Sequence, residues 1–104
     1  MVYVLNTPVL TNTGVFKAAD ISVDEARVVL ADGFQSAVGH QGTADVLSAV
    51  LGVHVPFNRQ AIVMQPGDKA VVFRLKTRLP EGVVLTAEEL QQLEYDLWLL
   101  ERLE

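Results

Sequence analysis

Short apolar segments separated by turn-forming residues recur along the chain, and their spacing distinguishes strands from helices. Alternating or continuous apolar runs of about four to eight residues are typical of strands, whereas apolar positions three and four residues apart are typical of helices. On this basis, strands are predicted over residues 1–10, 15–21, 34–38, 53–55 and 70–75.

Two helices are predicted between these strands. The first begins at Ser22, because a serine followed three residues later by Glu25 has the form of a capping box, and it ends at residues 32–33, where a glycine can take the left-handed cap. The second covers residues 43–51 and ends at Gly52. Each helix has an apolar face, so each is expected to pack against the sheet.

A third helix is predicted over residues 86–104. It begins at a second capping-box sequence, Thr86 to Glu89. Its apolar stripe contains Leu90, Leu93, Leu97 and Leu100, and neighbouring apolar residues widen the stripe beyond what one domain face needs. We therefore expect this carboxyl-terminal helix to be a packing or interface element.

The order of these elements predicts an α/β (α+β) fold, with a small mixed β-sheet of about five strands flanked by helices. The chain has 104 residues, enough for a single domain over residues 1–104 with one modest core. Half of the residues are hydrophobic and the mean hydropathy is +0.29. This is high for a small soluble monomer, so we expect some apolar surface to be hidden in a subunit interface.

Several function classes are disfavoured by composition. No apolar run approaches the roughly 18 residues of a membrane-spanning helix, and no basic segment precedes an apolar one at the amino terminus, so we expect a cytoplasmic protein with no membrane partner. The chain has no cysteine, which excludes disulfides, thiolate metal ligands and cysteine nucleophiles.

The charge balance argues against binding of long nucleic acids. The formal net charge is −5 and the isoelectric point is about 4.9, so the molecule as a whole repels a polyanion. Nevertheless, five of the eight basic residues fall within twenty positions: Arg59, Lys69, Arg74, Lys76 and Arg78. This cluster fits either a local pocket for a small anion or strand-edge charges that discourage aggregation.

Candidate chemistry is concentrated in residues 36–43, between a strand end and a helix start. His40 lies there between Gly39 and Gly42, and glycines allow close approach of the backbone to a ligand. The first amides of the following helix are unpaired and lie at the positive end of its dipole, which favours a phosphate. The alternative is that His40 is a polar surface residue in an ordinary strand-to-helix turn.

Five segments of the chain resemble one known family. In order they are residues 3–6, 36–40, 58–59, 67–69 and 78–82, and they are similar to the ring nucleases found as viral anti-CRISPR proteins against type III systems and to their cellular relatives. The similarity extends from residue 3 to about residue 89. It implies a small mixed α/β subunit, a two-fold homodimer, and cleavage of cyclic tetra-adenylate without a metal ion or other cofactor.

The resemblance also implies a set of site residues. His40 matches the catalytic histidine of the family, and Arg78 and Glu81 complete the expected catalytic set. Arg74 stands where the family can have a polar amide, and Val9 or Thr11 replaces a serine of the first loop. The expected substrate-binding residues are Asn6, Thr11, Ser36, Gly39, Gln41, Gly42, Thr43, Arg59 and Arg74.

The implied reaction needs no protein nucleophile, because a ribose 2′-hydroxyl attacks the neighbouring phosphorus once the two are held in line. His40 is expected to give a proton to the leaving 5′-oxygen, Arg78 to hold the scissile phosphate, and Arg59 to support a neighbouring phosphate. Glu81 is expected to orient Arg78 or a ribose hydroxyl. The alternative is a non-catalytic module that sequesters the cyclic nucleotide or docks a protein through the carboxyl-terminal helix.

Overall fold

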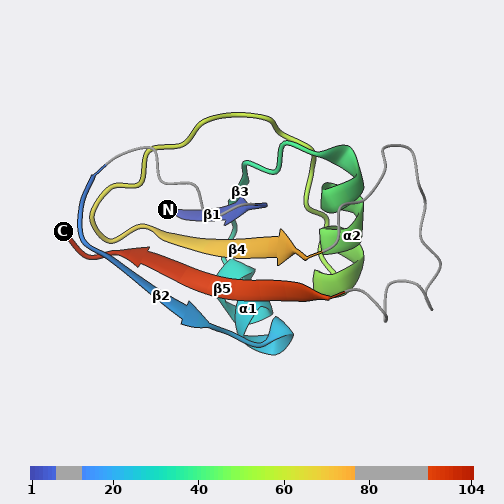
Figure 1. Ribbon diagram of the computed structural model, residues 1–104, viewed down its shortest axis with the longest axis horizontal. Coiled ribbons are helices and arrows are strands. Elements are labelled where there is room, and N and C mark those ends of the chain that lie inside the picture. The colour runs from blue at the N-terminus through green and yellow to red at the C-terminus, as the bar shows by residue number, and fades with distance from the viewer. Residues whose placement is uncertain (7–12, 77–93) are drawn as a thin grey trace.

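The computed structural model describes residues 1–6, 13–76 and 94–104. Within these residues it contains a five-stranded sheet and two helices (Figure 1). The predicted fold class, a small mixed sheet of about five strands flanked by helices, is confirmed. In chain order the elements are β1 (Val2–Leu5), β2 (Phe16–Asp20), α1 (Val23–Leu30), β3 (Gln35–Ser36), α2 (Gln41–Leu51), β4 (Lys69–Leu75) and β5 (Tyr95–Arg102).

The strand order places three parallel strands together on one side of the sheet. The order is β2-β5-β4-β1-β3, with β1 parallel to both β3 and β4. β5 is antiparallel to β4 and to β2. The carboxyl ends of β1, β3 and β4 therefore open at the same edge of the sheet, which in open α/β sheets is where ligands bind.

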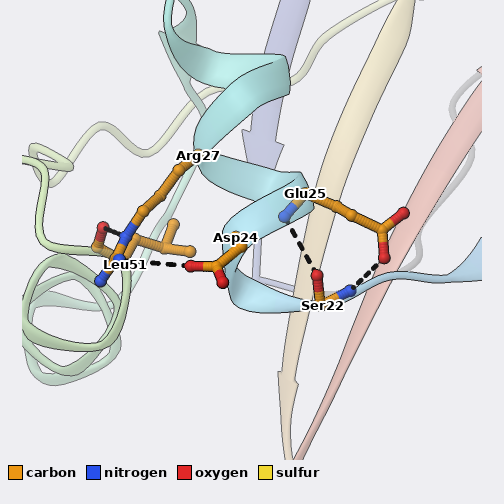
Figure 2. A network of polar contacts seen from close by, with 5 residues as sticks. All are labelled: Ser22, Asp24, Glu25, Arg27 and Leu51. Atoms are coloured by element: carbon orange, nitrogen blue, oxygen red, sulfur yellow. Dashed lines mark hydrogen bonds and ion pairs between the residues drawn. The ribbon is translucent and has the colours of Figure 1, made fainter.

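Helix α1 begins as the sequence predicts and also fixes the end of α2. The Ser22 hydroxyl accepts from the Glu25 amide, and the Glu25 carboxylate accepts from the Ser22 amide, both at 3.1 Å (Figure 2). Arg27 forms an ion pair of 3.5 Å with Asp24 and donates from Nε to the Leu51 carbonyl at 2.6 Å. The side chain of one helix thus caps the carboxyl end of the other, which fixes their relative position.

Helix α2 begins two residues before the predicted start and ends at Gly52 as predicted. Gly52 has a φ of 68°, the left-handed cap that glycine adopts without strain. The predicted strand over residues 53–55 is wrong, because Val55 donates its amide to the Ser48 hydroxyl at 2.9 Å and accepts from the same hydroxyl at 3.2 Å. Neither described helix is long and apolar enough to cross a membrane.

The sheet is apolar on both faces. On one face α1 and α2 cover a core that includes Phe73, Val4, Val71, Leu47 and Leu51, all of them fully buried. On the other face a smaller cluster lies beneath the connection from α2 to β4, and Arg102 donates from its guanidinium to the Met64 carbonyl of that connection. Strands buried on both faces have continuous apolar sequences rather than alternating ones.

The predicted third helix is wrong over residues 95–102, and burial on both faces of the sheet explains why. Residues 95–102 form β5, a strand paired on both sides, while residues 86–93 lie outside the described residues. Leu97 joins the core beneath the helices, and Leu100 joins the cluster on the opposite face. An apolar run that fills both faces of an inner strand also satisfies a helical spacing, so its period could not distinguish the two structures.

Candidate functional site

The sheet topology brings three of the candidate residues, Asn6, His40 and Arg74, toward the end of the sheet where the parallel strands end. Asn6 directly follows β1, and His40 lies four residues after the end of β3. Leu5 at the end of β1 pairs with Val72, and β4 continues to Leu75, so Arg74 lies beyond the end of its neighbour. Figure 1 shows α2 at the end of the sheet toward which β1 and β4 point. Residues that are far apart in sequence are thus gathered where the parallel strands end.

His40 is the N-cap residue of α2. Its φ of −137° and ψ of 120° are extended, and its Nδ1 accepts from the Thr43 amide at 3.1 Å. The Thr43 hydroxyl lies 3.2 Å from the same nitrogen. The imidazole is half-buried, and its Nε2 has no hydrogen bond or ion pair to any residue in the ranges that the structure describes. One ring nitrogen is therefore bound to the helix, while the other has no hydrogen-bond partner among the described residues.

The two glycines beside His40 make room for side chains. A Cβ on Gly42 would lie 3.1 Å from Cε1 of His40, and a Cβ on Gly39 would lie 3.1 Å from Cγ of Arg59. Neither glycine has a positive φ. The sequence therefore uses glycine here to let the imidazole and the arginine lie against the backbone, and Arg59 is held close to the residue that precedes His40.

The segment that leads to His40 is held by the connection that follows α2. Ser36 is buried, and its hydroxyl donates to the Pro56 carbonyl at 2.7 Å and accepts from the Val38 amide at 3.3 Å. The side chains of Asn58 and Gln60 donate to the Ser36 carbonyl at 2.8 and 3.2 Å. Ser36 is predicted to contact substrate, and its hydroxyl has a structural role in this arrangement. Sequence reasoning did not assign the supporting role of the two amides, because it depends on contacts across 22 and 24 positions.

The remaining candidates differ in their surroundings. Gln41 is exposed and donates to the Asp45 carboxylate at 2.9 Å. Arg59 and Arg74 are exposed, and within the described part of the chain neither guanidinium has a hydrogen bond or an ion pair. Lys76, in contrast, pairs with Asp96 at 3.6 Å. The predicted site residues Thr11, Arg78 and Glu81 lie outside the described residues.

Elsewhere in the described residues, the structure contains an open hollow and no cluster of metal-ligating side chains. An open hollow of about 350 Å³ lies on β2 and β5, lined by Ala18, Ala19, Asp20 and Trp98. β2 and β3 are the two outermost strands of the sheet, on opposite sides of it. The hollow on β2 is therefore separate from the segment that leads from β3 to His40. No group of three or more histidine, aspartate or glutamate side chains that could hold a metal ion occurs in residues 1–6, 13–76 and 94–104.

Comparisons with known proteins match nearly the whole chain. The sequence model of the family described as STIV B116-like matches residues 2–97. Protein 26 of Sulfolobus islandicus filamentous virus is 41% identical over 107 residues, covering 97% of this chain and 91% of the viral protein. YddF of Bacillus subtilis is 38% identical over 103 residues, covering 96% of this chain and 95% of the bacterial protein. The structure of B116 from Sulfolobus turreted icosahedral virus has the same fold, with a TM-score of 0.80 at 19% identity, over 97% of this chain and 98% of B116.

Proposed function

This chain belongs to the STIV B116-like family, and we propose that it is a ring nuclease that cleaves cyclic tetra-adenylate without a metal ion. The products are two linear di-adenylates, each ending in a 2′,3′-cyclic phosphate. Removal of this second messenger would dampen type III CRISPR signalling in the cytoplasm of a prokaryotic cell. The relatives in archaeal viruses and in a bacterium fit a role in either a virus or a cell.

The observation that carries the proposal is the placement of His40. Its imidazole caps α2 through Nδ1, leaving Nε2 without a described partner at the edge where three parallel strands end. Arg59 packs against Gly39 in the adjacent backbone, and Arg74 extends from β4 at the same edge. A proton donor, two guanidinium groups with no ion pair among the described residues, and a helix N-terminus are the components that a phosphodiester requires.

The proposed reaction is a transesterification within the substrate. A ribose 2′-oxygen forms a bond to phosphorus, the bond from phosphorus to the 5′-oxygen breaks, and the 2′-hydroxyl proton passes to solvent. His40 gives a proton to the departing 5′-oxygen through Nε2, while guanidinium groups stabilise charge on the phosphate. Because the nucleophile already belongs to the substrate, the protein acts mainly by holding it in line.

A homodimer matches the symmetry of this substrate. A ring of four identical nucleotides contains a two-fold axis, so a two-fold dimer can present one His40 to each of two opposite phosphodiesters. The ring carries about four negative charges, whereas this chain carries a formal charge of −5. Binding therefore depends on the local field of the arginines and of the first amides of α2 rather than on the net charge.

Product analysis tests the proposed function. Radiolabelled cyclic tetra-adenylate is incubated with the protein in EDTA, and the expected result is conversion to linear di-adenylate with a cyclic phosphate end. Tight binding with an unchanged ring would instead support the sequestering alternative. If cyclic tetra-adenylate is neither bound nor cleaved, both the proposed ring nuclease activity and the sequestering alternative are wrong. Docking of a protein through a carboxyl-terminal helix has lost its basis, because residues 95–102 are a strand.

Replacing Gly42 with alanine is expected to separate stability from activity. Alanine favours a helix over glycine by up to about 1 kcal/mol, which offsets the crowding of the capping ring, so the stability of Gly42→Ala should stay within about 1 kcal/mol of the parent protein. The added Cβ would lie 3.1 Å from the His40 ring, which must move by a few tenths of an ångström. We expect roughly tenfold slower cleavage, since small displacements of a reacting group are costly.

Thermal unfolding and single-turnover cleavage of the ring measure the two effects. Ala49→Gly is the matched control, because Ala49 is an exposed position of the same helix. This control should be less stable by up to about 1 kcal/mol and should cleave at the parent rate. Full activity of Gly42→Ala would show that the position of the imidazole against Gly42 has no catalytic importance.

A further inference from the structure

We propose that Thr43 is a positioning residue that sets the proton arrangement of the His40 imidazole. Two groups of Thr43 approach the same ring nitrogen: its amide at 3.1 Å and its hydroxyl at 3.2 Å from Nδ1. Thr43 is predicted from the sequence to contact substrate, whereas the geometry directs its polar groups at His40. The catalytic part of this inference rests on the proposed function; the proton arrangement does not.

The amide determines the resting form of the ring. A backbone N–H can only donate, so Nδ1 of His40 must accept from it. A neutral imidazole carries one N–H, and the nitrogen that accepts cannot be the one that carries it. The neutral imidazole of His40 therefore has its proton on Nε2, the nitrogen that has no hydrogen bond to the described residues.

The hydroxyl has a different role, because it can either donate or accept. To act as an acid, the imidazole must first take a proton at Nδ1, and the new N–H then points toward the helix amides. Of the two Thr43 groups, only Oγ1 can accept from this N–H. When Nε2 has given its proton to the 5′-oxygen, the ring keeps its proton on Nδ1. The same hydroxyl then continues to accept a hydrogen bond from this N–H.

Burial makes this hydroxyl difficult to replace. Thr43 is 8% exposed, so solvent has little access with which to substitute for a missing hydroxyl. Valine has nearly the shape of threonine and a similar helix propensity, so Thr43→Val removes the hydroxyl while leaving the backbone amide in place. Serine restores the hydroxyl without the methyl group. The two variants therefore separate the hydrogen bond of the side chain from its packing.

The first test uses the protein without substrate. In ¹⁵N-histidine-labelled protein, long-range ¹H–¹⁵N correlation spectra distinguish a protonated from an unprotonated ring nitrogen. We expect the neutral His40 ring to show an unprotonated Nδ1 and a protonated Nε2, and His54, which is exposed, to serve as the internal reference. A neutral His40 ring protonated on Nδ1 would overturn the inference, whatever the protein does to cyclic tetra-adenylate.

The second test compares Thr43→Val with Thr43→Ser. With cyclic tetra-adenylate, we expect Thr43→Val to lower the single-turnover rate about tenfold, the value of roughly one net hydrogen bond, with an unchanged dissociation constant. Thr43→Ser should stay within about threefold of the parent rate, since it keeps the hydroxyl. Parent-like cleavage by Thr43→Val, equal losses in both variants, or weaker binding without a slower cleavage step would each contradict a positioning role.

The two tests keep this inference separate from the proposed function. If the parent protein leaves cyclic tetra-adenylate intact, the proposed function fails, and the NMR measurement still decides whether Nδ1 of His40 accepts from the Thr43 amide. If Thr43→Val does not fold, Thr43→Ser and the NMR measurement decide instead. Circular dichroism of each variant establishes which case applies.

Discussion

Replacing His40 with alanine is expected to slow cleavage of cyclic tetra-adenylate by roughly 10²- to 10⁴-fold, the usual contribution of a general acid. Activity should not vanish, because in-line placement of the 2′-hydroxyl depends on other groups. The same substitution removes the N-cap of α2, which costs about 0.5–2 kcal/mol of stability. Single-turnover kinetics at a fixed pH measure the rate, and denaturant unfolding measures the stability.

His40→Asn separates these two effects. Asparagine is among the best N-cap residues, so its side chain can accept from the Thr43 amide, but it has no titrating proton to give. We expect parent-like stability together with the same loss of cleavage as His40→Ala. His54→Ala is the control for loss of a histidine as such, because His54 is exposed and lies outside the site. Undiminished cleavage by His40→Asn would rule out His40 as the proton donor.

The parts of the fold that the sequence predicted correctly depend on near neighbours. The capping box at Ser22 is completed by Glu25 three residues away, and the end of α2 at Gly52 needs only one backbone conformation. The long-range arrangement was not predictable in this way. The helical interpretation of residues 95–102 failed because burial on both faces of a strand depends on which strands lie beside it.

In the candidate site, too, features set by near neighbours could be predicted and long-range contacts could not. His40 and its glycines stood out in the sequence, but the predicted helix start at residue 43 concealed the N-cap, since α2 begins at Gln41. A start at Gln41 makes His40 the cap and places the Thr43 amide on its ring, an arrangement that the sequence does not signal because histidine is not among the preferred N-cap residues. The approach of Arg59 to Gly39 could not be predicted, because it depends on a connection that returns after α2.

The largest expected loss of stability comes from Phe73→Ala, at about 3–5 kcal/mol. Phe73 is fully buried in the middle of β4, within the core beneath the two helices. Its ring stacks on Tyr95 with 4.9 Å between centroids. Removing the ring leaves a cavity that the surrounding sheet cannot easily fill. Guanidinium unfolding at one protein concentration measures the loss, and Val28→Ala, at a position 75% exposed, should change stability by less than about 0.5 kcal/mol.

The same residue tests the strand at residues 95–102. Phe73 pairs with Leu97, so Tyr95 reaches its ring as a diagonal neighbour across two antiparallel strands. A double-mutant cycle with Phe73→Leu and Tyr95→Leu should therefore give a coupling of about 0.5–1.5 kcal/mol, the value of an aromatic pair beyond its buried area. A coupling near zero would contradict the contact between the two rings, and with it the register that places Tyr95 diagonally opposite Phe73. A clear coupling would establish in solution the strand that replaces the predicted carboxyl-terminal helix.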